Sequence, residues 1–269
     1  MRAITIDELK QIQLEIMQAV HEYCLEHRLH YSLAYGTLIG AIRHKGFIPW
    51  DDDIDIMMPR KDYEQLVKGF CHPYYRLHDF SNDKEYVHPY AKVEDTRTEL
   101  IENTNAKNLG INIDVFPVEN MFDTPEQCTA FLSEIRKIKK KFRMKLLRPS
   151  KKNVWWKRIA IRISKILVYN QSLRSITQRQ LDKVATLTND KSEFVAIVNC
   201  NDCSDVYLHS FWRRKLFEEY MTVPFEDRHF QIISAYDEQL KQLFGDYMTP
   251  PPVEKRSSPH TLNHIYWKE

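Results

Sequence analysis

The sequence predicts an α+β protein in which a mixed β-sheet is flanked by helices. Segments with helical periodicity and segments with strand periodicity follow one another without strict alternation, which favours a mixed sheet over a purely parallel one. Hydrophobic residues make up 43% of the chain and charged residues 28%, which is typical of a globular protein. With 269 residues, the chain is long enough to bury one large core.

The N-terminal third begins with a helix predicted over residues 7–28. Thr5 and Glu8 form the pattern of a capping box ahead of it. Its apolar residues recur every three or four positions, namely Leu9, Ile12, Ile16, Val20 and Tyr23. A short strand at 30–34 and the turn Gly36–Thr37 follow, and the turn leads into a short helix with the sequence LIGAIRHK. In DDDIDIMMP, acidic and apolar residues alternate, which predicts a half-buried strand that ends at Pro59.

The rest of the chain alternates between strands and longer helical stretches. We expect a helix at 60–70, strands at 74–80, 90–101, 110–116 and 194–198, two or three helices within 124–187 with breaks near Pro149 and Asn170, and a last helix at 231–245. The segment TPPPVEKRSSPH is rich in proline and is expected to be extended.

Several classes of protein do not fit the sequence. It contains neither a GxGxxG nor a GxxxxGK[ST] motif, so a glycine-cradled nucleotide site is not expected. It has no apolar run of about 20 residues that could span a bilayer, and MRAITIDELKQ lacks the apolar stretch of a secretory signal. The five cysteines are few and scattered, which favours reduced thiols and a cytoplasmic location. The lone CxxC pair, Cys200 and Cys203, does not suffice for a structural zinc site.

The acidic strand is the most informative part of the sequence. Residues two apart in a strand project from the same face, so Asp53 and Asp55 point together, with Asp51 at the strand entrance. Neighbouring carboxylates repel unless a cation lies between them, and Mg²⁺ prefers such hard oxygen ligands. The alternative is an acidic edge strand that faces water. A third carboxylate, Asp114 in the apolar segment GINIDVF, makes that alternative weaker.

The turn Gly36–Thr37 precedes the acidic strand. A glycine and a hydroxyl residue at a strand–helix junction allow backbone N–H groups to approach a phosphate at the helix N-terminus. Many such turns contain glycine, so this signal depends on its position next to the aspartates.

These motifs resemble those of the LicD family. The segments that carry the resemblance are AYGTLIGAIRHKGFIPWDDDIDIMMPRKDYEQL, GINIDVFPVE and LFGDYMTPPPVEKRSSPH. Members of the family transfer phosphocholine from CDP-choline onto teichoic acids and lipopolysaccharides. Their fold is similar to that of the DNA polymerase beta nucleotidyltransferases, and fukutin-related protein carries a related catalytic domain. The resemblance implies a single LicD-like catalytic domain over 1–269 with a helical basic insert at 124–187.

The resemblance also assigns roles to site residues. It makes Asp53, Asp55 and Asp114 the ligands of Mg²⁺, or alternatively Mn²⁺, with Asp51 as a supporting catalytic acid. It makes Gly36 and Thr37 the phosphate-binding turn.

Other residues near these motifs are candidates to bind the donor. Arg43, His44, Lys45, Lys92 and Arg97 are candidates to bind its diphosphate, although any of them could be a solvated surface charge. Trp50 could stack on cytosine or on a quaternary ammonium, or it could belong to the core.

A strongly basic stretch lies in the middle of the chain. Residues 135–181 contain sixteen Lys or Arg and no acidic residue, and without them 23 basic residues face 37 acidic ones. Together with Trp155, Trp156 and several isoleucines, this composition suits the surface of an anionic membrane or an anionic glycan. Alternatively, the stretch could bind nucleic acid, or its charges could simply face water. Binding of a specific nucleic acid is not expected.

We therefore expect a magnesium-dependent phosphotransferase in cell wall or lipopolysaccharide biosynthesis. It would take a CDP-alcohol, CDP-choline being favoured, as donor and a glycan or lipid-linked glycan (teichoic acid, lipopolysaccharide or capsule) as acceptor, at the inner face of the membrane. Two other hypotheses remain. One is a nucleotidyltransferase that uses a nucleoside triphosphate, and the other is a non-enzymatic protein that binds anionic polymers or membranes.

Overall fold

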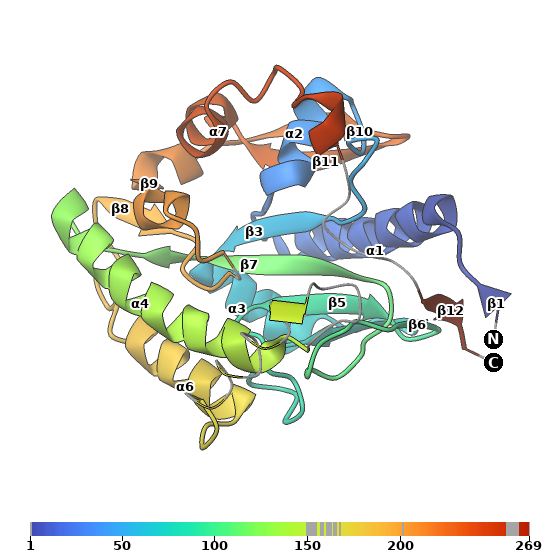
Figure 1. The fold of residues 1–269 in the computed structure, drawn as a ribbon. Coiled ribbons are helices and arrows are strands. Elements are labelled where there is room, and N and C mark those ends of the chain that lie inside the picture. Colours follow the sequence, from blue (N-terminus) through green and yellow to red (C-terminus); the bar gives the residue numbers. More distant parts are fainter. Residues whose placement is uncertain are drawn as a thin grey trace.

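The computed structural model describes residues 2–148, 155–156, 159, 163, 166, 168–200, 202–256 and 264–268. The break expected near Pro149 and the SSPH end of the proline-rich segment therefore lie outside the described residues. Figure 1 shows a curled sheet with helices on both sides. The α-helices are α1 (Ile6–His27), α2 (Tyr35–Arg43), α3 (Arg60–Gly69), α4 (Pro125–Leu146), α6 (Leu173–Val184) and α7 (Tyr236–Phe244). Three short 3₁₀ helices lie at Val206–His209, Arg214–Phe217 and Val253–Lys255.

The central sheet is mixed, as the sequence predicts. Its main path runs in the order β2-β3-β7-β5-β4, with β8 paired to β7 and β9 paired to β8. Among the described strands of this sheet, β3 and β7 pair in parallel and the other pairs are antiparallel. The strands are β2 (Ser32–Leu33), β3 (Asp55–Pro59), β4 (Tyr75–His78), β5 (Ala91–Asp95), β7 (Asn112–Asn120), β8 (Phe194–Ala196) and β9 (Phe211–Arg213).

Helix α1 packs its apolar face against β5 and β7. The capping box predicted at its start is confirmed, because the Thr5 hydroxyl accepts from the Glu8 N–H and the Glu8 carboxylate accepts from the Thr5 N–H. Leu9, Ile16 and Val20 are fully buried in the main core. Helices α4 and α6 lie side by side in Figure 1 and pack against each other.

Two smaller sheets complete the fold. Strands β10 (Tyr220–Phe225) and β11 (Arg228–Ile233) form a hairpin beside α2. Strands β1 (Arg2–Ala3), β12 (Ile265–Trp267) and β6 (Thr98–Leu100) form a second sheet, which brings both chain ends together, as Figure 1 shows.

Three predicted elements need correction. The strand expected from Asp51 begins only at Asp55, because the partner strand β2 has two residues and pairs no earlier than Ile56. The strand expected over 90–101 is two strands, β5 and β6, which turn at 96–97. The helix expected over 231–245 starts at Tyr236, because 231–233 belong to β11.

Candidate active site

Two aspartates meet at the start of the parallel strand pair of the central sheet. Asp55 on β3 and Asp114 on β7 are register partners, and the Asp114 N–H donates to the Ile54 carbonyl at 2.9 Å. Residues in register on adjacent strands project to the same face of a sheet. The two carboxylates therefore lie next to each other, although their residues are 59 positions apart in the sequence.

Asp51 and Asp53 add negative charge to this pair from the segment ahead of β3. The pKa of Asp55 is raised well above its usual range, first by burial and then by the charges of Asp53 and Asp114. Burial, together with the charge of Asp53, also raises the pKa of Asp51 to about 7. Carboxylates destabilised in this way bind a cation favourably, because it removes their mutual repulsion.

Gly36 and Thr37, which the structure places in the first turn of α2, contact the aspartates directly. The buried Thr37 hydroxyl accepts a hydrogen bond of 2.9 Å from the Asp55 N–H, so it positions the first residue of β3. A Cβ atom at Gly36 would overlap the Asp51 carboxylate. A side chain at position 36 would therefore force the Asp51 carboxylate to move from this place.

Helix α2 begins at this turn without a side-chain cap. Its N-cap residue is Ala34, and no side chain bonds to the first-turn N–H groups in this described part of the chain. Such N–H groups, together with the helix dipole, form a favourable site for a phosphate. The first residue of α2, Tyr35, adopts the left-handed region at φ 46°, a strained backbone conformation of the kind that gathers at functional sites.

Lys92 on β5 supplies the positive charge of the site. It lies opposite Asp114 in register, forms an ion pair with that carboxylate, and donates to the Asn112 Oδ1 at 2.9 Å. Burial lowers the pKa of Lys92, but the charges of Asp114 and Glu102 outweigh it and the net shift is upward. The lysine therefore stays charged beside the aspartates.

A small cavity of about 60 Å³ opens between these side chains. Asp53, Lys92 and Asp114 line it together with Gln13, Glu102 and Asn112. Asn112 was not singled out from the sequence, although its position two residues before Asp114 on one strand puts both on the same face. Glu102 lies in an irregular segment and carries no comparable signal.

The carboxylate oxygens at this site could serve in part as the ligands of a divalent cation. Carboxylate oxygens are suitable ligands, and Mg²⁺ commonly uses one or two carboxylates together with substrate phosphate. Among the residues that the structure describes, no three His, Cys, Asp or Glu side chains form a ready-made metal cluster, and Lys92 holds Asp114. The arrangement thus resembles a site completed by substrate more than a preformed cage.

A second group of predicted residues lies around the other end of α2. Arg43 donates to the Tyr247 carbonyl at 2.5 Å and to the His44 ring at 2.9 Å. Trp50 lies edge-on to His44, with ring centroids 6.2 Å apart, and the Arg256 guanidinium lies 5.0 Å from the Trp50 ring centre. Since Trp50 precedes Asp51, this aromatic and cationic group borders the aspartates.

Two predicted cations do not join the aspartates. The Lys45 ammonium is exposed and donates to the Ile42 carbonyl at 3.2 Å. Arg97 forms a two-pronged ion pair with the fully buried Asp95 and lies 4.5 Å from the Tyr74 ring centre. Because Asp95 projects from the face of β5 opposite to Lys92, Arg97 stabilises the β5–β6 turn and is not brought to the site.

Comparisons with known proteins identify the family of the chain. The family model described as LicD/FKTN/FKRP, nucleotidyltransferase domain, matches residues 28–158, a range that contains the turn and all four aspartates. The lipopolysaccharide cholinephosphotransferase LicD of Haemophilus influenzae is 30% identical over 275 residues, which cover 99% of each chain. An uncharacterized protein of Rickettsia typhi is 36% identical over 86 residues, which cover 30% of this chain and 27% of that protein.

Proposed function

The chain belongs to the LicD family, and we propose that it transfers phosphocholine from CDP-choline to a hydroxyl group of a cell-surface glycan and releases CMP. The name of the full-length Haemophilus relative supports both the phosphocholine group and lipopolysaccharide as the class of acceptor. A teichoic acid or a capsule would offer the same kind of hydroxyl. The observation that carries the proposal is the in-register pair Asp55 and Asp114 beside the Gly36–Thr37 turn. The family description supports a nucleotidyltransferase-like fold for the domain.

We propose that Mg²⁺, for which Mn²⁺ could substitute, is held by Asp53 and Asp55 with Asp114 as the third carboxylate. When bound, the ion would neutralise phosphate charge during phosphoryl transfer. The raised pKa of Asp55 supports this role, because burial and the charges of Asp53 and Asp114 disfavour its ionised form in the absence of a cation.

The chain's own groups then bind and orient the reactants. The first-turn N–H groups of α2 bind the donor diphosphate, and Lys92 holds the Asp114 carboxylate in place. The acceptor oxygen forms a bond to the phosphorus atom that bears choline, while the bond from that phosphorus to the oxygen of CMP breaks. The hydroxyl proton passes to a site carboxylate, for which Asp114 is the candidate.

We also propose that the basic stretch 135–181 brings the enzyme to the inner face of an anionic membrane. Among the described residues of this stretch, Trp155 and Ile166 are 72% and 71% exposed, and exposed apolar side chains in a cationic context suit the membrane interface. Lys139 departs from this pattern, because it is buried against Cys200 and the Tyr207 ring. Within the described part of the chain, no helix has the length and apolar character to cross a bilayer.

The products of the reaction test the proposal. Purified protein with Mg²⁺, CDP-choline and lipopolysaccharide should release CMP, and Asp53→Ala should abolish the release while the folded state persists. Release of pyrophosphate from CTP or ATP would instead identify a nucleotidyltransferase. Salt-sensitive binding to anionic polymers, without turnover and unaffected by Asp53→Ala, would identify a binding protein.

A further inference from the structure

Polar side chains continue from the aspartate pair across the same face of the central sheet. Two rows of register partners run from strand to strand, one made of Asp55, Asp114, Lys92 and His78, and the other of Asn112, Glu94 and Arg76. Neighbouring strands are about 4.8 Å apart, so three steps place His78 about 14 Å from Asp55. Two rows of polar residues therefore extend from the aspartates to the β4 edge of the sheet, where His78 and Glu94 are buried.

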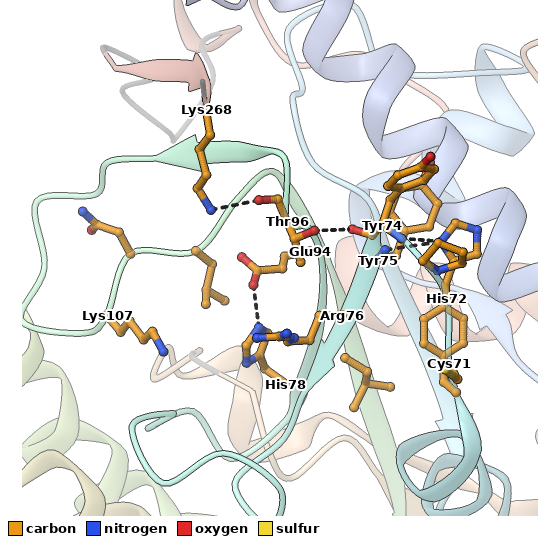
Figure 2. A pocket seen from close by; sticks show the side chains of 15 residues that line it. Cys71, His72, Tyr74, Tyr75, Arg76, His78, Glu94, Thr96, Lys107 and Lys268 are labelled. Carbon is orange, nitrogen blue, oxygen red and sulfur yellow. Dashed lines mark hydrogen bonds and ion pairs between the residues drawn. The ribbon is translucent and has the colours of Figure 1, made fainter. Parts of the chain in front are cut away.

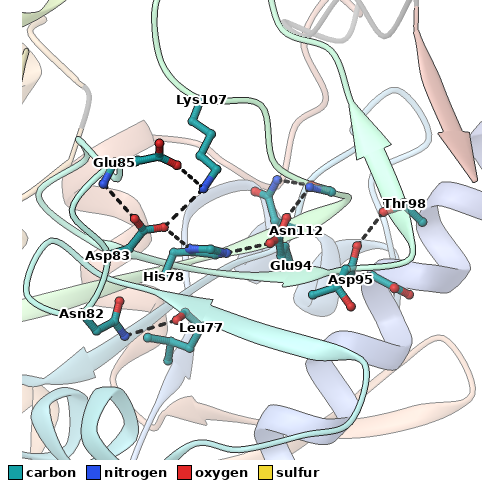
Figure 3. A network of polar contacts seen from close by, with 12 residues as sticks. Leu77, His78, Asn82, Asp83, Glu85, Glu94, Asp95, Thr98, Lys107 and Asn112 are labelled. Carbon is teal, nitrogen blue, oxygen red and sulfur yellow. Dashed lines mark hydrogen bonds and ion pairs between the residues drawn. The ribbon is translucent and has the colours of Figure 1, made fainter. Parts of the chain in front are cut away.

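A network of polar contacts holds the β4 end of these two rows in place, as Figure 3 shows. The His78 ring lies between two carboxylates, with Nδ1 2.8 Å from Asp83 and Nε2 2.7 Å from Glu94. Glu94 also accepts a hydrogen bond from the Gly110 N–H. Glu94 is buried, and its carboxylate oxygens contact the His78 ring and the Gly110 N–H within the protein.

A cavity of about 540 Å³ lies at this edge of the sheet (Figure 2). Arg76, Lys107 and Lys268 reach it from three separate segments. In the described chain, Arg76 has no carboxylate partner, and the Lys268 ammonium donates to the Thr96 carbonyl at 3.0 Å with no ion pair. The Lys107 ammonium forms ion pairs with Glu85 at 2.6 Å and with Asp83 at 3.9 Å. The cavity therefore presents three cations beside the Glu94 carboxylate, and among the described residues the Arg76 guanidinium is the one of the three with neither an ion pair nor a hydrogen bond to a protein group.

Aromatic rings complete the wall of the cavity. Tyr74 is 51% exposed, and the His72 ring stacks on Tyr75 with centroids 4.2 Å apart. Exposed rings beside cations are suited to a ligand that combines apolar C–H faces with negative charge. A sugar that carries a phosphate has this combination.

Shared lining residues link the large cavity to the cavity at the aspartates, with a narrow space of about 10 Å³ between them. Lys107 and Leu109 line both the large cavity and a narrow one beside it. Lys92 and Asn112 line both the narrow cavity and the cavity at the aspartates. The loop 101–110 therefore follows one path from the sheet edge to the reaction centre.

The strand order separates this path from the phosphate-binding turn. In the sequence β2-β3-β7-β5-β4, the Gly36–Thr37 turn follows β2 at one end, and the large cavity adjoins β4 at the other. The aspartates on β3 and β7 lie between them. A donor held at the turn and an anionic group held at the cavity would thus approach the aspartates from opposite sides.

We propose that the cavity at Arg76, Lys107 and Lys268 is an acceptor subsite that binds a phosphorylated sugar of the glycan, while a hydroxyl further along the same chain lies at Asp55 and Asp114. This inference rests on the proposed function, because it assigns the acceptor side of that reaction. It gives a role to the exposed Arg76 guanidinium, which has no ion pair among the described residues, and it makes a charged sugar part of what the enzyme recognises.

Binding measured without turnover tests the subsite directly. Glucose 6-phosphate, glucose and inorganic phosphate are titrated into the protein, and chemical shifts or heats are followed. Glucose 6-phosphate should bind at least tenfold more tightly than either of the others, and Arg76→Gln with Lys268→Gln should weaken it at least tenfold. Both replaced side chains are exposed, so the fold should persist. The matched control, Lys61→Gln with Lys68→Gln on α3, should bind as the wild type does.

Equal binding by the cavity variant and the wild type would overturn the subsite, and so would equal affinity for inorganic phosphate and glucose 6-phosphate. In turnover assays with lipopolysaccharide, the cavity variant should raise KM for the acceptor while kcat and KM for CDP-choline stay unchanged. A rise in KM for CDP-choline would contradict the assignment to the acceptor. Failure to release CMP would refute the proposed function, whereas the binding titration decides on the subsite independently.

Discussion

The Lys92–Asp114 ion pair permits a quantitative test of the site. Replacing Lys92 by methionine keeps most of the side-chain volume but leaves Asp114 beside Asp55 without its counter-charge. Breaking a fully buried pair costs about 3 to 5 kcal/mol, and an exposed pair contributes about 0 to 1 kcal/mol. The Lys92 and Asp114 side chains are 15% and 19% exposed, so we expect a loss of about 2 to 3 kcal/mol in the free energy of unfolding.

Urea denaturation at pH 7 in the presence of a chelator measures this loss. The double variant Lys92→Met/Asp114→Asn should recover part of it, because the uncompensated carboxylate is removed. Magnesium should stabilise Lys92→Met more than the wild type, because a divalent ion can replace the ammonium between the two carboxylates. Lys61→Met, on the exposed face of α3, is the control. A loss below about 0.5 kcal/mol for Lys92→Met, as in surface substitutions, would refute the reasoning.

Three further predictions follow from individual contacts. Gly36→Ala should lower kcat/KM by about 100-fold, the effect of displacing a reacting group by about 1 Å, because the added Cβ overlaps Asp51; wild-type kinetics would contradict the close approach. Burial lowers the pKa of His88 to about 3. Below about pH 6.5, His88 therefore binds a proton in the unfolded chain but stays unprotonated in the folded protein. Stability attributable to His88 is therefore present above pH 6.5 and lost as the pH falls, by about 2 kcal/mol at pH 5, and urea titrations of His88→Phe should show a shallower pH dependence than the wild type. Arg97→Gln should cost about 2 kcal/mol of stability through the buried Asp95 but leave kcat and KM unchanged, and a selective loss of activity would place Arg97 at the substrate.

Local sequence patterns were enough to predict a helix or a strand where a single pattern dominated the segment. The capping pair Thr5 and Glu8, with apolar residues at helical spacing, defines the start and buried face of α1. Alternation in GINIDVF correctly indicates a strand with Asp114 on one face. That Asp55 and Asp114 face each other could not be derived from either segment alone, because it depends on the parallel pairing of β3 with β7.

The hairpin β10–β11 shows why other elements escaped prediction. Its two-residue turn, Glu226–Asp227, contains no glycine, and Glu226 adopts the left-handed region at φ 54°. The usual Asn-Gly or Asp-Gly signal is therefore missing, and Pro224 within the first strand argues against a strand. Tertiary contacts compensate, since Glu226 accepts a hydrogen bond of 2.8 Å from the Phe47 N–H.

The two rows of polar residues that extend to β4 were not predicted, for a different reason. Arg76 and His78 alternate with buried residues in the predicted strand 74–80, and this pattern already places both on one face. The sequence does not reveal which strand lies beside them, so their connection to Lys92 and Asp114 becomes visible only through the sheet order.

Mass spectrometry of the acceptor tests the central claim most directly. Lipopolysaccharide incubated with the protein, CDP-choline and Mg²⁺ should gain phosphocholine in an amount equal to the CMP released. Asp55→Asn should abolish both products while its circular dichroism matches that of the wild type. Attachment of a nucleotide to the acceptor, or full transfer of phosphocholine by Asp55→Asn, would contradict the claim that the carboxylates of β3 and β7 carry out this reaction.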